Sequence, residues 1–447
     1  MRKVTLLAGL LVLAGCGSEG DSKQSASTGE DPTAATTQKT VSEKPSQKTS
    51  NISGETDAAT LVKRGESLIE QRQFLQAAQL LSQAVQLEPN SWNAYYQRAR
   101  AYSMMGQDAS ALADYKTAIR LSPNNARLHY SRGFFYLSHR SADQAIVDLK
   151  KSVRLDPTNP ESLQFLGLAY LAKEEHQQAI DTFSKLLQID PNRVDTLNNR
   201  GFAYFRAGRN PAAIQDFEQA IQLNPDKVNP YNNLGLVYFA MNDYRKAVAS
   251  LSEGIARGAN NPVLYQQRRE AYLMLNMISE ARADAAKLEW LKKLTVLNMK
   301  IARRPKHAKK FVERARHNLE GGDQESALDD FNRAVKIDPN YARGFSARAA
   351  FWFETGDYDR AIADCDKAIQ LEPHHEAHSI RGDAWMQKGD YERAIINYTQ
   401  AKRFDASVAK AYLMRARALK EKGDEKQAAR DLKRAIALDP SLEKSLQ

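Results

Sequence analysis

Cysteine is scarce in this chain, whose 447 residues include only Cys16 and Cys365. A small domain held together by disulfides needs many more cysteines, so that class of protein is excluded. Beyond the first twenty residues, no stretch reaches the roughly 18 apolar residues that a membrane-spanning helix requires. The sequence also lacks a Walker A, GxGxxG, HExxH or GxSxG motif in a supporting context, and it lacks a paired-carboxylate arrangement. We therefore expect no enzymatic activity and no cofactor.

The start of the chain has the composition of an export signal. A basic pair, RK, precedes an apolar segment at residues 4–13 that is too short to span a bilayer. The sequence LAGC follows, and it resembles the lipobox of bacterial lipoproteins, in which small residues precede a cysteine that is lipidated and becomes the new N-terminus. The resemblance implies that residues 1–15 are a signal peptide and that Cys16 is the lipidation site. A plain secretory signal with an incidental cysteine is the alternative.

Residues 16–57 are predicted to be a lipid-anchored, disordered tether. They consist mainly of Ser, Thr, Lys, Gln, Glu and Pro, and so few large apolar residues cannot offset the entropy of ordering the segment. As a flexible coil of about 40 residues, the tether would have an r.m.s. reach of roughly 35 Å. Gly17, not Asp, follows the cysteine, and in a Gram-negative envelope the resemblance then implies sorting to the outer membrane, facing the periplasm. The mature chain would retain only Cys365, so it could form no intramolecular disulfide.

Proline recurs with a period of 34 residues, and the series continues after a break: Pro89, Pro123, Pro157, Pro191, Pro225, Pro339, Pro373 and Pro440. In a repeat that ends near this proline, position 8 is Gly or Ala, position 11 is usually Tyr and position 20 is Ala, as in Gly201, Tyr204 and Ala213. Small residues let two antiparallel helices approach closely, and the proline ends the second helix. The pattern resembles the tetratricopeptide repeat (TPR) and covers nearly all of residues 58–441.

The resemblance implies an all-α fold, a right-handed α-solenoid of stacked TPR helix pairs whose first helices line a concave face. About eleven repeats in two stacks are expected, beginning near residues 58, 92, 126, 160, 194, 228, 262, 308, 342, 375 and 409. The first array, 58–295, has seven repeats, and the last of these is degenerate, with a second helix that is expected to continue to about Ile301. A basic connecting helix and turn at 296–307 leads to a second array of four repeats, 308–441, and a tail at 442–447.

Arginine recurs at position 7 of most repeats, and aspartate recurs at position 23. Seven repeats have both: Arg98 with Asp114, Arg132 with Asp148, Arg200 with Asp216, Arg268 with Asp284, Arg314 with Asp330, Arg348 with Asp364, and Arg415 with Asp431. The two repeats with leucine at position 7, Leu166 and Leu234, have Thr182 and Ser250 at position 23. This covariation within one chain predicts that the two positions face each other and that the arginine is half of an ion pair between packed helices. A row of carboxylate-binding arginines, as in clamps that hold acidic chaperone tails, is the alternative.

Positions 5 and 6 of the first helices are expected to look into the concave groove. Asparagines occupy both positions in two successive repeats, at Asn198, Asn199, Asn232 and Asn233. They resemble the asparagine ladder with which some long TPR superhelices hold a peptide backbone, since a side-chain amide both donates and accepts. Apolar residues at positions 9 and 12 lie beside them: Phe134, Phe202, Phe205, Leu236 and Phe239. If these are exposed, repeats three to six form a groove for an extended or helical segment of a partner protein; solvated amides and packing between repeats are the alternative.

Positive charge is concentrated in one segment. Residues 287–317 contain eleven Lys or Arg and two Glu, a net charge of +9, against +10 for the whole chain. The predicted basic patch comprises Lys292, Lys293, Lys300, Arg303, Arg304, Lys306, Lys309 and Lys310. Behind a lipobox, anionic headgroups or an acidic partner suit this patch better than nucleic acid, which we do not expect to bind. A merely solvated basic helix is the remaining interpretation.

Three of the eight histidines, His374, His375 and His378, lie together at the start of the tenth repeat. Two histidines four residues apart on one helix face can bind a transition metal. A third ligand is not evident beyond Glu372 or Glu376, so we expect no metal site. Cys365, at the inward position 24 of its repeat, is expected to be a core residue.

These features predict a non-catalytic TPR scaffold lipoprotein that mediates protein–protein interactions in the bacterial cell envelope through its concave groove. One or more proteins would bind the groove, and the N-terminal lipid would bind the membrane. One alternative is a self-associating structural envelope protein, in which a homodimer forms through exposed terminal repeats because only residues 442–447 follow the last repeat. Another is an accessory protein that binds metal at the histidine cluster.

Overall fold

The computed structural model describes residues 57–444, which form 23 helices and no strand. The all-α repeat fold predicted from the sequence is confirmed. The predicted signal peptide, Cys16 and all but the last residue of the tether lie outside the described residues. The helices are α1 (Ala58–Glu70), α2 (Phe74–Leu87), α3 (Trp92–Met104), α4 (Asp108–Leu121), α5 (Ala126–Ser138), α6 (Ala142–Leu155), α7 (Pro160–Ala172), α8 (His176–Ile189), α9 (Val194–Arg206), α10 (Asn210–Leu223), α11 (Val228–Ala240), α12 (Tyr244–Arg257), α13 (Pro262–Met274), α14 (Ile278–Arg303), α15 (Ala308–Glu320), α16 (Gln324–Ile337), α17 (Ala342–Glu354), α18 (Tyr358–Leu371), α19 (His375–Gln387), α20 (Tyr391–Gln400), α21 (Ala406–Glu421), α22 (Glu425–Leu438) and α23 (Ser441–Lys444).

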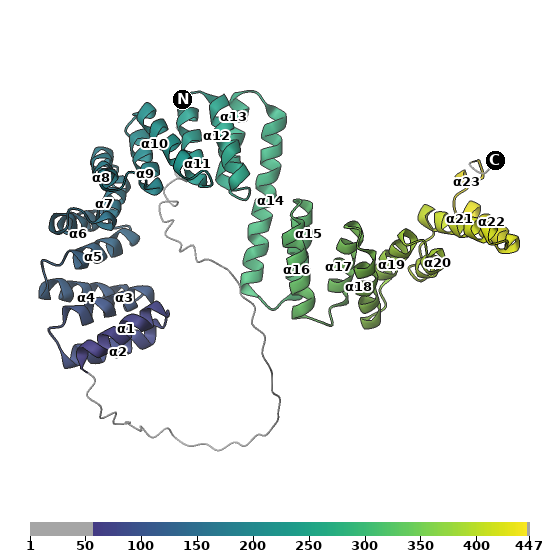
Figure 1. Cartoon of the computed structure of the whole chain (residues 1–447), viewed down its shortest axis with the longest axis horizontal. Coiled ribbons are helices and arrows are strands. Elements are labelled where there is room, and N and C mark those ends of the chain that lie inside the picture. The colour runs from purple at the N-terminus through teal and green to yellow at the C-terminus, as the bar shows by residue number, and fades with distance from the viewer. Residues whose placement is uncertain (1–56, 445–447) are drawn as a thin grey trace, which may run out of the picture. The chain divides into compact units, whose positions relative to one another are not determined.

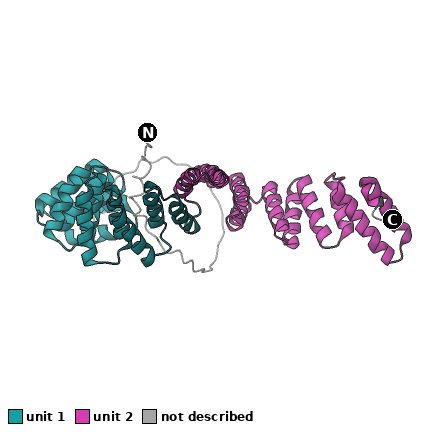
Figure 2. Cartoon of the chain, turned by 90° about the horizontal axis from the view of Figure 1, so that it is seen from above, with its two compact units in different colours: residues 1–259 teal, residues 260–447 magenta. Residues whose placement is uncertain are grey.

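The chain divides into two compact units, residues 1–259 and 260–447 (Figure 2). The described part of unit 1 consists of α1 to α12, which are six consecutive helix pairs, and unit 2 begins with the pair α13 and α14 (Figure 1). The sequence grouping placed this seventh pair with the first six. The division into compact units instead places it with the pairs that follow it.

Each regular repeat is an antiparallel helix pair with a first helix of 13 residues and a second of 14, as in α9 and α10. The turn between the two helices needs a residue with positive φ, and Gly208 provides it at 76° without the steric cost of a Cβ atom. Within the pair, position 8 faces position 24. A Cβ atom on Gly201 would lie 2.8 Å from a ring carbon of Phe217, so only glycine lets the two helices approach this closely.

The first helices of successive repeats lie along one side of each unit. In unit 1, α1 contacts α3, α5 contacts α7, α7 contacts α9, and α9 contacts α11. In unit 2, α15 contacts α17 and α17 contacts α19. Helices that meet their counterparts in the next repeat lie on the inner, concave side of a stacked array, because neighbouring repeats approach most closely there. We therefore take the first helices as the inner face of each unit.

Three helices of the repeats in unit 2 depart from the regular lengths, among them α21, a first helix of 16 residues. The second helix of the seventh repeat, α14, is one continuous helix of 26 residues that ends at Arg303, close to the end expected from the sequence, and Figure 1 shows it running well past α13. The second helix of the tenth repeat, α20, has only 10 residues. It ends at Gln400, and Arg403 in the following turn donates to both carboxylate oxygens of Asp383 at 2.9 and 2.7 Å. This early end was not predicted from the sequence.

Candidate functional site

The arginines at position 7 are paired inside the structure. In each of the seven repeats with Arg and Asp, the guanidinium Nε and Nη2 donate to the two carboxylate oxygens at 2.6–2.9 Å, from Arg98 to Asp114, Arg132 to Asp148, Arg200 to Asp216, Arg268 to Asp284, Arg314 to Asp330, Arg348 to Asp364, and Arg415 to Asp431. The aspartates are only 1–7% exposed. Hydrogen bonds to the Asp216 carboxylate raise the pKa of Arg200 above its ordinary value. The predicted ion pairs between packed helices are confirmed.

Several of these arginines also bridge to the preceding repeat through Nη1. Arg98 donates to Ser82 at 3.2 Å, Arg200 donates to Ser184 at 3.2 Å, and Arg348 donates to Asn332 at 2.9 Å. One arginine side chain thus joins its own repeat to the one before it. Since Nε and Nη2 of all seven arginines are bound to buried aspartates, the structure favours the ion-pair interpretation over a carboxylate-binding row.

Two of the four predicted groove asparagines bind each other. Asn233 Nδ2 donates to Asn198 Oδ1 at 2.9 Å, and Asn198 is only 8% exposed, so this pair joins the fifth repeat to the sixth. Asn199 and Asn232 are partly exposed. The Asn232 Oδ1 atom is buried and has no hydrogen-bond partner among the described residues. An amide acceptor left in this state destabilises a protein unless another molecule satisfies it.

The predicted apolar groove residues lie on the inner helices of repeats three, five and six in unit 1. Phe134 on α5 is 40% exposed, and its ring lies edge-on to Phe165 of α7, with centroids 4.8 Å apart. Tyr130, one turn before Phe134, has its ring 5.9 Å from Phe165. The other four are half-buried, at Phe202, Phe205, Leu236 and Phe239. Sequence reasoning did not include Phe165 or Tyr130, although both occupy the groove positions 5 and 6 of their repeats.

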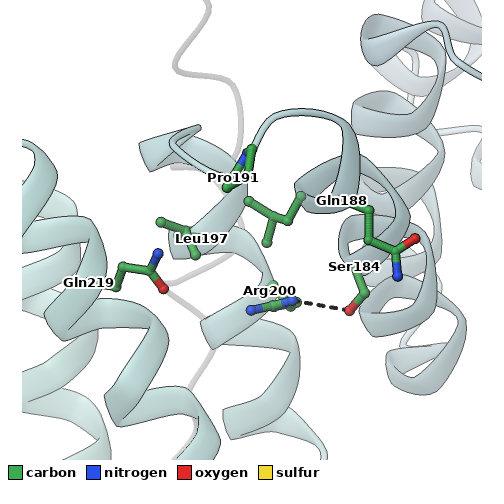
Figure 3. A pocket seen from close by; sticks show the side chains of 7 residues that line it. Ser184, Gln188, Pro191, Leu197, Arg200 and Gln219 are labelled. Atoms are coloured by element: carbon green, nitrogen blue, oxygen red, sulfur yellow. Dashed lines mark hydrogen bonds between the residues drawn. The ribbon is translucent and has the colours of Figure 1, made fainter.

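A shallow hollow of about 250 Å³ opens among α8, α9 and α10 of repeats four and five (Figure 3). It is lined by Ser184, Leu187, Gln188, Pro191, Leu197, Arg200 and Gln219. Figure 3 shows the hydrogen bond from Arg200 to Ser184 at its edge. Because that arginine is already bound to Ser184 and Asp216, the hollow offers mainly neutral amides to a ligand.

A second hollow, of about 330 Å³, is lined by residues of α15, α16, α17 and α19 in unit 2. Leu319, Phe331 and Phe351 form an apolar floor, and it opens where Ala347 and Ala350 leave space on α17. Its rim carries the exposed charges of Arg316, Glu354 and Glu376. The sequence analysis missed this hollow. The available signal was alanine at both groove-facing positions, 6 and 9, of the ninth repeat.

The predicted basic patch lies on the second half of α14, the turn after it and the first turn of α15. Three of its lysines pair with glutamates: Lys292 with Glu289 at 2.6 Å, Lys293 with Glu320 at 3.2 Å, and Lys310 with Glu313 at 2.9 Å. The remaining five are exposed: Lys300, Arg303, Arg304, Lys306 and Lys309. Since residues 287–317 contain eleven Lys or Arg and only two Glu, the surface stays strongly positive.

Each histidine of the tenth repeat has a contact of its own. His374 caps α19 by accepting from the Ala377 backbone N–H at 3.3 Å, and His375 Nδ1 lies 3.1 Å from the Gln400 carbonyl oxygen. His378 Nδ1 lies 3.4 Å from Asn397 Oδ1. Within residues 57–444, no three His, Cys, Asp or Glu side chains are gathered in a way that could hold a metal ion. In the same part of the chain, no helix is both long and apolar enough to cross a bilayer.

These features define a helical repeat protein whose surfaces, not an enclosed cleft, are available to partners. Sequence models of the tetratricopeptide repeat match residues 59–91, 80–113, 105–139, 167–208, 203–242, 228–257, 353–409 and 409–442. Together these ranges include more than half of the chain. The chain belongs to the tetratricopeptide repeat proteins, whose stacked helix pairs are typical of non-catalytic scaffolds for protein interactions.

Several solved structures share this repeat. MamA is 26% identical and matches 36% of this chain and 94% of its own, with a TM-score of 0.35. YrrB, described as a TPR protein with an unusual peptide-binding site, is 21% identical over 39% of this chain and 90% of its own, with a TM-score of 0.36. PilF of Pseudomonas aeruginosa is 17% identical over 48% and 97%, with a TM-score of 0.42. At these TM-scores the likeness does not extend to function, and no curated protein matches the chain.

Proposed function

We propose that this chain is a non-catalytic TPR scaffold, anchored by lipid at Cys16 in a bacterial cell envelope, that binds a segment of a partner protein on the inner face of repeats three to six. We call this surface the inner groove and define it by Phe134, Phe165, Asn199, Phe202 and Asn232. All five residues lie on the first helices α5, α7, α9 and α11 of unit 1.

One observation carries the groove part of the proposal. Phe134 is a large aromatic side chain, 40% exposed, on the inner helix α5, where it packs edge-on against Phe165. An exposed aromatic cluster of this kind typically anchors a partner's apolar side chain. The buried Oδ1 of Asn232, which has no partner among the described residues, lies on α11, two first helices beyond Phe165, and could accept a hydrogen bond from the partner's backbone N–H. Aromatic contact and amide recognition together suit an extended or helical protein segment.

The envelope part rests on the sequence alone. The charged start, short apolar segment, small residues and cysteine fall in the order of a lipoprotein signal. Durable attachment needs more than one acyl chain, and the lipoprotein resemblance implies a diacylglyceryl group and an N-acyl chain on Cys16. Feeding cells an alkyne-tagged fatty acid tests this step: the wild-type chain is expected to carry the tag, and the Cys16→Ala chain is not. A tag retained in Cys16→Ala would contradict the anchor without affecting the groove.

The groove is tested by placing a photoreactive amino acid at Phe134 in the full chain in living cells. The matched control is the same amino acid at Val147, which is 67% exposed on the second helix α6 of the same repeat. We expect a specific protein to be crosslinked from Phe134 and not from Val147, and mass spectrometry then identifies it and the captured segment. A synthetic peptide of that segment should bind the purified wild-type chain and bind Phe134→Ala at least tenfold more weakly, as for an interface hot spot.

Two results would contradict the groove proposal. One is equal crosslinking from Phe134 and Val147. The other is capture from Phe134 of nothing, or only of a second copy of this chain, which would instead favour the self-associating alternative. In the last repeat, α22 exposes no large apolar side chain, whereas Leu75 and Leu87 on α2 of the first repeat are 60% and 62% exposed, so capture of a second copy is the outcome that separates the two proposals.

A further inference from the structure

Helix α14 is almost twice as long as the second helix of a regular repeat. It has 26 residues against 14 in α12 or α16, and its partner α13 has 13. The extension of 12 residues is about 18 Å long at the α-helical rise. An antiparallel partner of 13 residues can cover only the first half of α14, so the second half lacks a partner from its own repeat.

One face of this second half is buried against α15. Leu297 and Ile301 are 6% and 9% exposed, and Ile301 belongs to the core that contains Phe311 and Ala315. Arg314 Nη1 donates to Asn298 Oδ1 at 2.7 Å. Just before the extension, Trp290 Nε1 donates to the His317 carbonyl oxygen at 2.9 Å. The orientation of the extension about its own axis is therefore fixed by α15.

The opposite face of the extension is exposed and combines apolar and basic side chains. Lys292, Val296, Met299 and Arg303 recur at intervals of three and four residues, so they lie on one side of the helix, with Lys300 beside them. Val296 is 43% exposed and Met299 is 50% exposed. We call these five residues the basic face. The apolar side chains of Val296 and Met299 are thus exposed to solvent, with cations on either side.

The cations continue beyond the helix. Arg304, Lys306 and Lys309 are exposed in the turn and the first turn of α15. The first turn of α15 has no acidic residue, although the positive end of the helix dipole disfavours cations there. Residues 287–317 contain eleven Lys or Arg and only two Glu. This local excess of positive charge is not balanced within the segment.

We propose that the basic face binds the surface of an anionic lipid bilayer. The cations would contact phospholipid headgroups, while Val296 and Met299 would enter the boundary between headgroups and acyl chains. Each Lys or Arg near such a surface strengthens binding by roughly fivefold. Long basic side chains can also keep their charge among the headgroups while their aliphatic stems contact the acyl chains. This contact goes beyond the proposed scaffold function and does not require a lipid at Cys16.

A bilayer fits this face better than an acidic protein segment does. The basic face is the outward side of a single helix, and neither hollow described above includes any of its residues. A peptide bound here would gain little enclosure, whereas a flat charged surface can contact the whole length of a protruding helix face. Apolar side chains at the centre of a cationic helix face are also the arrangement typical of helices that lie in a membrane interface.

The test is a fluorescent label that reports entry of the basic face into lipid. An environment-sensitive dye is attached at Met299→Cys in the full chain carrying Cys16→Ser, and the remaining Cys365 is fully buried and should stay unlabelled. The matched control carries the dye at Val147→Cys in unit 1, an exposed apolar site on α6, whose three Lys or Arg and two Asp give that helix a net charge of only +1. Vesicles of phosphatidylethanolamine with phosphatidylglycerol are compared with vesicles of phosphatidylcholine alone, and circular dichroism checks that every variant is folded.

We expect a blue shift of the dye at residue 299 with phosphatidylglycerol vesicles, and none at residue 147 or with phosphatidylcholine. The lipid concentration for half-saturation should rise about a hundredfold when Lys292, Lys300 and Arg303 are all changed to Gln, and it should rise with added salt. Val296→Ser keeps every charge and should weaken binding roughly tenfold, because it removes an apolar anchor.

Other outcomes would overturn the proposal. A shift of equal size with phosphatidylcholine would show that charge does not select the surface, and an equal shift at residue 147 would show that the basic face is not what binds. No shift with any vesicle would exclude lipid binding by this face. A shift with polyglutamate in place of vesicles would assign the face to an acidic polypeptide instead.

Discussion

Arg200 binds Asp216, sixteen residues later, through two hydrogen bonds of 2.8 Å from Nε and 2.7 Å from Nη2. Its Nη1 atom donates to Ser184 Oγ at 3.2 Å. Since these three residues lie on α9, α10 and α8, one side chain joins three helices from two repeats. Asp216 is 3% exposed, so it depends on the arginine to balance its charge.

Removing the arginine alone should therefore be costly. Arg200→Leu leaves the buried Asp216 without a counter-ion, and we expect the free energy of unfolding to fall by about 3 kcal/mol or more. Denaturant unfolding followed by circular dichroism measures the change, and hydrogen exchange of α9 and α10 locates it.

The chain supplies a matched control for this substitution. Its fourth repeat has Leu166 and Thr182 in place of Arg and Asp. The double variant Arg200→Leu, Asp216→Thr should therefore regain stability to within about 1 kcal/mol of the wild type, because no unpaired charge remains. If the double variant is as unstable as Arg200→Leu, an unpaired Asp216 is not the cause of the loss.

The glycine of the fourth repeat allows a close approach of α7 and α8. A Cβ atom on Gly167 would lie 2.4 Å from Cε1 of Phe183, which is fully buried. Gly167→Ala should therefore lower the free energy of unfolding by about 1–3 kcal/mol, although alanine is the better helix former. Thermal unfolding by circular dichroism measures this. An unchanged or raised melting temperature would show that the Phe183 ring can move aside without loss.

The thiol of Cys365 should be unreactive in the folded protein. It is fully buried, and burial raises its pKa to about 12. Near pH 8 only about one thiol in 10⁴ would be ionised, against roughly a quarter for an ordinary cysteine. Iodoacetamide, followed by mass spectrometry, should therefore leave Cys365 unmodified until denaturant is added, whereas a cysteine at the exposed Leu75 should react at once. Rapid modification of Cys365 without denaturant would mean that this repeat opens readily.

Stability should depend on pH through His378. Burial lowers the pKa of its imidazole below the ordinary value of 6.5, and the nearby Arg381 acts in the same direction. The unfolded chain therefore takes up this proton first as the pH falls. The stabilising contribution is complete above pH 6.5 and is lost as the pH falls through the lower folded pKa.

His378→Gln should remove this part of the pH dependence. The denaturant midpoint of each protein is measured at neutral pH and near pH 5. The change in midpoint between the two pH values should be smaller for the variant than for the wild type, because glutamine cannot take up a proton. Parallel curves for the two proteins would show that other groups control stability in this range.

The inner groove was only partly predictable from sequence. Repeat positions 5, 6 and 9 place the predicted residues on the first helices of their pairs, and their role in binding stays a prediction. They did not show that Asn198 and Asn233 bind each other. They also did not show that Phe134 is exposed, at 40%, whereas Phe202 is more deeply buried. Those outcomes depend on how neighbouring repeats are rotated, which the sequence pattern does not specify.

The sequence by itself determined the repeat. Antiparallel helix pairs follow from three features of the sequence: the 34-residue period, the small residues at positions 8 and 20, and the paired Arg and Asp. Each of these features acts within one repeat or between adjacent repeats. The degenerate seventh repeat and its long second helix were also predicted, but only the tertiary structure decided that the tenth repeat is shortened and what the surfaces offer. It ends α20 at Gln400, and it leaves Val296 and Met299 exposed on the half of α14 that extends beyond α13. Exposure depends on which neighbours cover a helix, and that is settled by packing between elements and not by the local sequence.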